Sequence, residues 1–272
     1  IQVMSGTSGY SEYFRYPADA FDFRTDEFGV SVGDSEFSSD GIKIRINSND
    51  TEIKGDISYS GITPWPGSLI NPGIMGWYSF MPFMECYHGV VSMNHFLKGS
   101  VTQNGESIDF DGGKGYIEKD WGKSFPSSWV WLQSNNFNYP EASFMLSVAR
   151  IPWLRGHFTG HLCFLKTSSG LYRMMTYTGA KIKKLDISAN SCECIIEDKK
   201  YIIEISARQL GTAELKAPDL GNMDRPIKES LDSEVEVKLM KKGGGQIFHD
   251  KTVRAGMEIH GDTTELTDEL KL

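Results

Sequence analysis

The sequence predicts an all-β protein whose short antiparallel strands close into barrels or stack into a sandwich. Apolar and polar residues alternate along most of the chain, whereas helical periodicity is scarce. Turn residues recur at short intervals between the alternating segments, a spacing that is typical of barrels and sandwiches. With 272 residues, the chain is long enough for one large domain or two ordinary ones.

Three segments show the strand pattern most clearly. Residues 41–46 alternate apolar with basic side chains, and residues 234–239 alternate charged with apolar ones. Asn104-Gly105 lies between two alternating segments and predicts a tight hairpin turn. Further strands are expected at residues 144–150, 157–166, 171–178, 192–197, 201–208 and 246–258.

The remaining segments are predicted to be loops and turns. Residues 215–223 contain Pro218 and Gly221 and are expected to form a long loop, and the acidic tail after Asp262 a frayed turn. The turn at residues 126–128 is the best candidate for a boundary between two halves, at 1–126 and 127–272. The Gly-Gly-Gly run before residue 246 lacks the pattern of a phosphate-binding loop, so nucleotide binding is not expected.

Charge and composition exclude several classes of function. The net charge of −8 and the absence of a Lys/Arg cluster argue against nucleic-acid binding, which depends on a basic footprint. No apolar stretch approaches the roughly 20 residues that span a bilayer, and no signal peptide is visible. We therefore expect a cytoplasmic, globular protein. Because the chain begins at Ile1, we also expect an N-terminal segment, with any targeting signal in it, to precede these residues.

Neither the cysteines nor the histidines form a metal-binding pattern. Cys192 and Cys194 make a Cys-x-Cys pair with no second pair nearby, which supports neither a zinc ribbon nor a redox motif. We expect these two and the remaining cysteines, Cys86 and Cys163, to be reduced strand residues. His157 and His161 would lie roughly 13 Å apart on a strand, too far for one metal. No metal and no cofactor is predicted.

Acids, amides and indoles are concentrated in one run of the sequence, GYIEKDWGKSFPSSWVWLQSNNF at 115–137. A second informative block, GWYSFMPFMECYHGVVSMNH, lies upstream at 76–95. In order and spacing the two blocks resemble the tocopherol cyclase family. A further similarity at Phe14 and residues 33–46 extends the resemblance across most of the chain.

The resemblance implies a pair of lipocalin-like antiparallel barrels, related to the carotenoid hydratase group, whose members handle long isoprenoid chains. The first barrel would span 1–126 and lack an N-terminal segment, and the second would span 127–272. The implied reaction is the cyclisation of a prenylated quinol to a chromanol, which begins when an alkene is protonated. Hydration of an isoprenoid alkene shares that first step and uses water as the nucleophile.

Protonating an alkene requires a strong acid in a dry pocket, and Glu118 and Asp120 are the leading candidates. Burial and a second carboxylate both help to keep a carboxylic acid neutral near neutral pH. On a strand, the two residues would project from one face with Cα atoms roughly 7 Å apart. One would donate the proton, and the charge of the other would raise the pKa of the donor. The structural alternative is a strand end whose acids pair with exposed lysines.

Glu85 and His88 form a second candidate pair, because a carboxylate near an imidazole can tune a general acid or base. In an unbroken strand these residues would point to opposite faces, so their cooperation requires a bend or a bulge. The alternative is a buried polar pair with a structural role only. His95 is expected to be a structural histidine on a barrel face, with its imidazole hydrogen-bonded.

Aromatic and amide side chains are expected to bind the substrate. Indole faces stabilise a developing cation well, and the candidates are Trp77, Trp121, Trp129 and Trp131. Trp121 could instead be a plug that closes a barrel end with its indole N–H on backbone carbonyls. Gln133 and Asn135 share the strand face of Trp129 and Trp131, and would bind a quinol hydroxyl or a water if that face lines the cavity.

Three classes of function remain open from the sequence. The leading hypothesis is an acid-initiated cyclase whose partner is a lipophilic small molecule, an isoprenoid or a prenylated quinol. Peripheral contact with a membrane or with lipid droplets would supply this substrate. The alternatives are a non-catalytic lipocalin-like carrier or an isoprenoid hydratase. A sugar-binding sandwich is less favoured, because nothing in the sequence places two acids at the separation of a glycosidase pair.

Overall fold

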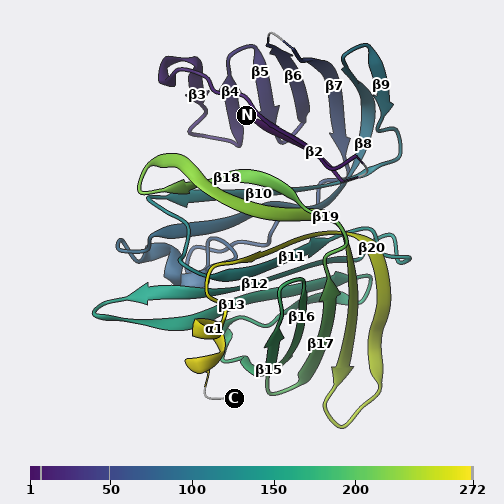
Figure 1. The fold of residues 1–272 in the computed structure, drawn as a ribbon. Helices are drawn as coiled ribbons and strands as arrows, with labels where there is room; N and C mark the ends of the chain where they lie inside the picture. Colours follow the sequence, from purple (N-terminus) through teal and green to yellow (C-terminus); the bar gives the residue numbers. More distant parts are fainter. Residues whose placement is uncertain (7, 49, 271–272) are drawn as a thin grey trace. The chain divides into compact units, whose positions relative to one another are not determined.

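The computed structural model describes residues 1–6, 8–48 and 50–270, and its main elements are two large antiparallel sheets (Figure 1). The predicted all-β fold is therefore confirmed. Helical structure in these residues is short and lies at η1 (Ala18–Ala20), η2 (Gly76–Phe80), η3 (Thr176–Thr178) and α1 (Thr264–Asp268). None of the helices in the described residues has the length and apolar character needed to cross a membrane.

The first large sheet has the strand order β10-β8-β7-β6-β5-β4-β3, with β9 paired to β8. Its strands are β3 (Phe21–Phe23), β4 (Gly29–Val32), β5 (Ser35–Ser38), β6 (Gly41–Asn47), β7 (Glu52–Ser60), β8 (Cys86–Gln103), β9 (Glu106–Asp109) and β10 (Lys114–Gly122). Asn104 and Gly105 turn β8 into β9 with φ values of 49° and 88°. Positive φ at both positions is what an Asn-Gly hairpin turn requires, so that prediction is confirmed. A separate two-stranded sheet pairs β1 (Gln2–Ser5) with β2 (Tyr10–Tyr13).

The second large sheet has the order β14-β13-β12-β11-β20-β19-β17-β16-β15, with β18 paired to β19. Its strands are β11 (Trp129–Ser134), β12 (Ser143–Trp153), β13 (Gly156–Thr167), β14 (Gly170–Arg173), β15 (Lys181–Ile187), β16 (Ser191–Glu197), β17 (Tyr201–Arg208), β18 (Ala213–Asp219), β19 (Asn222–Lys241) and β20 (Gln246–His260). All but one of the strands expected in this part of the chain are confirmed over their predicted length.

Two local predictions were wrong. The strand expected at 171–178 ends with β14, because the Thr178 hydroxyl bonds both the N–H and the carbonyl of Met175 and closes a 3-10 turn instead. The loop expected at 215–223 is a hairpin between β18 and β19. Leu220 and Gly221 turn it with φ values of 48° and 93°. Pro218 lies at a register shift in this pairing, where the ladder is interrupted and its missing N–H is tolerated.

Contacts along the chain group its residues into two compact units. One comprises 1–3, 12–65 and 90–119, and the other comprises 4–11, 66–89 and the residues from 120 onward. These units do not coincide with the halves 1–126 and 127–272. Residues 66–89 pack instead with the C-terminal sheet, where Tyr177 donates a hydrogen bond to the Ile74 carbonyl at 2.8 Å.

One apolar core fills the interior of the C-terminal unit. Side chains from β11, β12, β13, β15, β16, β17, β19, β20 and α1 contribute to it. Because strands along the whole sheet share one core, the sheet is strongly curved around its interior, as in a barrel. The N-terminal unit has a smaller core around Phe14, Ile44, Ile46 and Ile53. Buried side chains therefore fill the interior of the C-terminal unit where these strands meet.

The cysteines are free and lie on strands, as predicted. Cys163, Cys192 and Cys194 belong to the C-terminal core, whereas Cys86 begins β8 and is only half-buried. Burial raises the pKa of Cys192 to about 12 and raises the pKa values of Cys163 and Cys194 as well. Thiols react as thiolates, so the three core cysteines are inert while the unit is folded.

Alkylation with a maleimide near neutral pH is therefore expected to label native protein at Cys86 alone. The other three thiols should react only after unfolding in urea, which exposes them and restores an ordinary thiol pKa of about 8.5. Intact-mass spectrometry counts the labels, and Cys86→Ser should take up none in the native state. Rapid labelling of native Cys86→Ser would contradict the packed core.

Two histidines are buried in the sheets. His95 Nδ1 lies 3.0 Å from the Ser92 hydroxyl, so the imidazole is hydrogen-bonded, as we expected. His161 Nδ1 lies 3.0 Å from the Thr176 hydroxyl, which also accepts the His161 backbone N–H. Burial lowers the pKa of each imidazole to about 4, so both are neutral at neutral pH.

Acid is expected to destabilise the C-terminal unit through His161. Its folded pKa lies below its unfolded value of about 6.5, so its stabilising contribution is complete above that pH and is lost as the pH falls toward 4. Between about pH 7 and pH 5 this single group should lower the free energy of unfolding by about 2 kcal/mol. Urea titrations at both pH values measure the loss. His161→Phe should lose that part of the pH dependence, and an unchanged dependence would contradict the assignment.

Candidate functional site

The two sequence blocks singled out above lie on neighbouring strands. The upstream block forms η2 and the first half of β8, and the downstream block forms β10 and β11. β10 is the neighbour of β8 in the first large sheet. Sheet pairing therefore brings together residues that lie some thirty positions apart in the sequence.

A histidine and an aspartate form the centre of the candidate site. His88 Nδ1 on β8 lies 2.8 Å from Asp120 Oδ1 on β10. The His88 side chain is only 13% exposed, whereas Asp120 reaches the solvent. The His88 backbone N–H also donates to Met75 Sδ at 3.0 Å, which ties the segment before η2 to the strand. Shielding of the imidazole from water strengthens its hydrogen bond to the carboxylate.

This pair combines one member from each predicted pair. His88 meets Asp120 rather than Glu85, because Glu85 precedes the first residue of β8. The Glu85 backbone carbonyl instead accepts the N–H groups of Lys123 and Ser124, at 2.8 and 3.4 Å. Glu85 thereby anchors the chain that leaves β10.

Glu118 lies two residues before Asp120 on β10, so alternation puts both carboxylates on one strand face, as predicted. It is half-buried and accepts a hydrogen bond from the Tyr116 hydroxyl at 2.7 Å. Among the described residues, His88, Glu118 and Asp120 have ligand atoms within 4.8 Å of one another and could hold a metal ion. The absence of a metal site stays a prediction, and this is the place to test it.

The same alternation directs Trp121 away from the acids. Trp121 follows Asp120 on β10 and Tyr87 precedes His88 on β8, and their rings stack with centroids 5.4 Å apart and planes at 11°. The Tyr87 hydroxyl donates to the Met81 carbonyl. The Trp121 indole is half-exposed and lies on the strand face opposite Asp120. The role of Trp121 in binding a substrate stays a prediction.

Trp77 belongs to an aromatic cluster that sequence reasoning missed. Trp153 at the end of β12 is the centre of this cluster. Its ring makes edge-to-face contacts with those of Trp77, Tyr78 and Phe83, at centroid distances of 6.1, 5.5 and 5.1 Å. Phe158 and Tyr177 also contact this group. No local pattern marks Trp153 or Tyr177, because their partners lie some seventy to a hundred residues away in the sequence.

Trp129 and Trp131 lie on the face of β11 opposite the main core. Trp129 is buried, donates its indole N–H to Glu258 at 2.6 Å and stacks on His260 at 4.3 Å. Both indoles pack in a second apolar cluster with Ile227 and other residues of β12, β18 and β19. The contacts of Trp129 are those of a structural residue.

The amides on this part of the chain are buried as well. Gln133 continues the face of Trp131, and its side-chain nitrogen is buried without a hydrogen-bond partner among the described residues. Asn135 follows the last residue of β11, and its side-chain oxygen lies 3.5 Å from the amide nitrogen of Asn136. Their role in binding a substrate stays a prediction.

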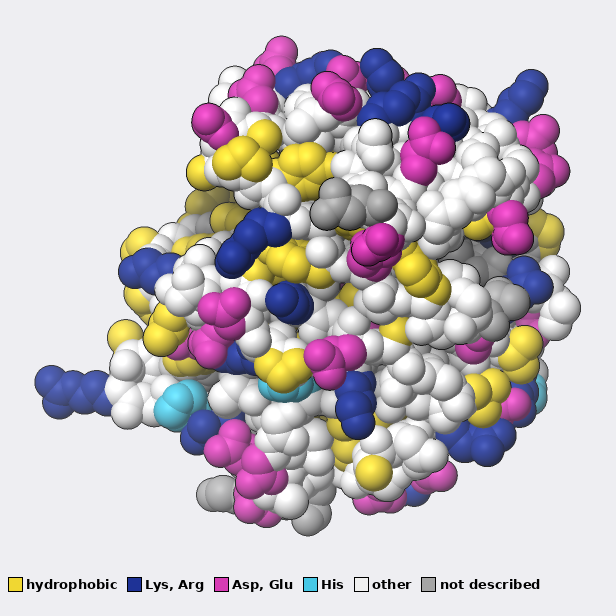
Figure 2. All heavy atoms as spheres, turned by 45° about the horizontal axis from the view of Figure 1, so that its top comes forward, with side chains coloured by type: hydrophobic (Ala, Val, Ile, Leu, Met, Phe, Trp, Pro, Cys, Tyr) yellow, Lys and Arg dark blue, Asp and Glu magenta, His cyan; other side chains and the backbone are white. Residues whose placement is uncertain are grey.

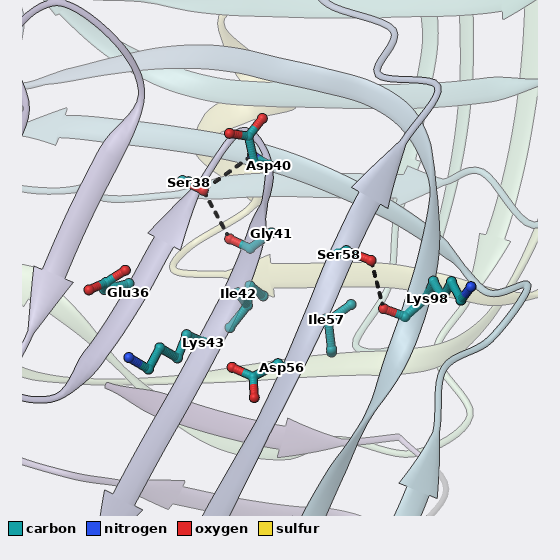
Figure 3. Close-up of a pocket in the computed structure, with 10 residues that line it drawn as sticks. All are labelled: Glu36, Ser38, Asp40, Gly41, Ile42, Lys43, Asp56, Ile57, Ser58 and Lys98. Atoms are coloured by element: carbon teal, nitrogen blue, oxygen red, sulfur yellow. Dashed lines mark hydrogen bonds between the residues drawn. The ribbon is translucent and has the colours of Figure 1, made fainter.

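Two surface hollows contain no predicted site residue. The one in Figure 3, of about 320 Å³, lies over β5, β6 and β7 and is lined largely by charged and hydroxyl side chains such as Glu36, Lys43 and Asp56. Ser58 closes one side by donating to the Lys98 carbonyl at 3.1 Å. A second hollow of about 300 Å³ is lined by Glu193, Glu204, Lys238 and similar residues. Such linings do not suit an isoprenoid chain, because charged groups lose hydration without gaining partners.

The fold and the site define a class of β protein in which an imidazole and a carboxylate are held together on a strand pair. A model of the tocopherol cyclase-like family matches residues 31–261, so the chain belongs to that family. The resemblance of the two sequence blocks is thereby confirmed.

Two curated relatives match over 68% of this chain. One is described as a probable chloroplastic tocopherol cyclase of Oryza sativa subsp. japonica, 25% identical over 199 residues, and the other as the chloroplastic tocopherol cyclase of Zea mays, 26% identical over 200 residues. The matched part spans only 42% and 41% of those relatives.

Two solved structures show a distant likeness. Kievitone hydratase from Nectria haematococca gives a TM-score of 0.48 at 14% identity, over 89% of this chain and 72% of that one. A putative AttH from Nitrosomonas europaea gives 0.49 at 15% identity, over 94% and 78%.

Trp129 and Trp121 are expected to respond differently to truncation. Trp129→Ala removes a buried indole and its hydrogen bond, and should lower the free energy of unfolding by about 3–5 kcal/mol. Trp121→Ala removes a half-exposed ring and should cost about 1 kcal/mol or less. Urea unfolding followed by circular dichroism measures both, with Trp129→Phe as an intermediate variant. Equal losses at the two positions would contradict the contrast in burial.

Proposed function

We propose that this chain is an enzyme that binds an amphipathic isoprenoid and cyclises a prenylated quinol to a chromanol by acid catalysis. The observation that carries the proposal is the 2.8 Å contact between the shielded His88 imidazole and the Asp120 carboxylate. Membership in the tocopherol cyclase-like family supports it. The names of the two plant relatives support the same reaction.

The pair supplies the proton that starts the reaction. The proton shared by His88 Nδ1 and Asp120 Oδ1 passes to the less substituted carbon of the trisubstituted alkene, which leaves a tertiary cation. The phenolic oxygen of the quinol then bonds to that cation and closes the ring. The phenolic proton returns to the pair, so the product is an isomer of the substrate and no co-reactant is consumed.

Glu118 and Tyr116 support this step from the same strand. A carboxylate beside the pair favours its protonated form and stabilises positive charge on the substrate. The hydrogen bond from Tyr116 holds the Glu118 side chain in one orientation. Hydration of the alkene would use the same proton donor and differ in its nucleophile, so the identity of the product separates the two reactions.

Asp120→Asn is the decisive variant. It keeps the size of the side chain but removes the group that shares the proton, so turnover of a prenylated hydroquinone should fall by at least about 100-fold. The turnover of Glu118→Gln should fall less, by about tenfold. Chromatography of the chromanol product measures the rates, and thermal melting should show both variants folded.

Glu85→Gln is the matched control, because the Glu85 contacts at this end of the sheet are made by its backbone. Near-wild-type turnover in Asp120→Asn would overturn the proposed acid. Loss of activity with a chelator and its recovery with a divalent cation would assign the three side chains to a metal ion instead. A hydrated, uncyclised product would identify a hydratase.

A further inference from the structure

Two turns of the C-terminal unit expose large aliphatic side chains at their tips. Leu69 and Ile70 are 97% and 83% exposed and form the centre of a turn between Ser68 and Asn71. Leu154 is 81% exposed and adopts a φ of 54° in the turn between β12 and β13. Figure 1 shows that hairpin projecting beyond the neighbouring strands of its sheet. A bulky residue at a positive φ is unfavourable for the fold alone.

The aromatic cluster joins the two tips. The Tyr177 hydroxyl donates to the carbonyl of Ile74, which follows the first tip in the chain, and the Tyr177 and Tyr78 ring centroids lie 6.3 Å apart. Tyr78 in turn contacts Trp153, which is bonded directly to Leu154. Three further aromatic rings of this segment are about half-exposed, those of Trp77, Phe80 and Phe83. We call the exposed side chains of residues 69, 70, 77, 80, 83 and 154 the apolar face.

The chemistry of the apolar face differs from that of the rest of the surface. About a quarter of the chain is charged, yet residues 66–84 include no charged side chain. Cations lie at its edge instead, with Arg155 beside Leu154 and Arg173 near Tyr177. Figure 2 shows several hydrophobic side chains on the surface of the molecule, interspersed with charged ones.

The residues that flank each tip are paired through their backbones. Ser68 and Asn71 exchange two hydrogen bonds, at 2.9 and 3.1 Å, and Trp153 pairs with Gly156 across the other turn. Chain that enters an apolar layer must carry its own backbone hydrogen bonds. At a membrane interface, amphipathic aromatic rings lie at the level of the headgroups. Exposed aliphatic tips with arginines beside them therefore suit a surface of anionic lipids.

We propose that the apolar face docks the protein on a lipid surface that carries anionic headgroups. Leu69, Ile70 and Leu154 enter the acyl layer, the aromatic rings lie at headgroup depth, and Arg155 contacts the headgroups. This docking goes beyond the proposed function, because it requires neither His88 nor Asp120 and is measured without turnover.

Vesicle flotation tests the proposal on the full chain. Wild-type protein should float with vesicles of phosphatidylcholine mixed with phosphatidylglycerol, and the double variant Leu69→Ser with Leu154→Ser should partition at least about tenfold less. Arg155→Gln should weaken binding about fivefold on the anionic vesicles and leave binding to pure phosphatidylcholine unchanged.

The chain offers a closely matched control. Leu220 has the same exposure as Leu154, 81%, and a similar φ of 48° at the tip of the β18–β19 hairpin, but it lies outside the apolar face. Leu220→Ser should therefore float like the wild type. All variants should keep their melting temperature within a few degrees, because the changed side chains are exposed.

Three results would overturn the proposal. The first is a wild type that floats with neither vesicle, and the second is an equal loss of flotation in Leu220→Ser. The third is sedimentation of the wild type as a dimer that the double variant converts to a monomer. That last result would assign the apolar face to a second copy of the chain.

Discussion

The candidate site depends on the pairing of β8 with β10 and on the alternation of side chains along the two strands. Alternation places His88 and Asp120 together on one face and Tyr87 and Trp121 together on the other. A shift of one residue in one strand would turn its side chains to the other face and separate both pairs. The chemistry of the site therefore requires one register, and the contacts around it hold that register.

Those contacts lie at the end of the strand pair where β8 begins and β10 ends. The Glu85 carbonyl binds the backbone beyond the end of β10, and Met75 Sδ accepts the N–H of His88. The C-terminal unit supplies a core in which side chains such as Leu132 and Val237 are fully buried. A site supported by a packed core loses little orientational freedom when a substrate binds, which is the condition for efficient proton transfer.

Local patterns sufficed to predict the strands and the individual acids, but not which acid meets the imidazole. Glu118 and Asp120 share a face because they are two residues apart, whereas the partner of His88 depends on a register between strands far apart in the sequence. The hairpin at 213–222 was missed because Leu220, not an Asn or a Gly, opens its turn at a positive φ. The contacts of Trp129 with Glu258 and His260 could not be predicted, because a sequence shows the parity of a strand face but not what covers it.

The same segment links the chemistry of the site to the surface of the molecule. Residues 66–84 lead directly into β8, so the chain that carries the exposed tip at Leu69 also carries Met75, which holds the backbone of His88. A prenylated quinol dissolves in lipid and is scarce in water, so an enzyme that acts on it gains from binding at the lipid surface. Docking through this segment would therefore place the His88 strand next to the phase in which the substrate is concentrated. Under the proposed docking, the uncharged residues 66–84 would serve both lipid contact at one end and the shielding of His88 at the other.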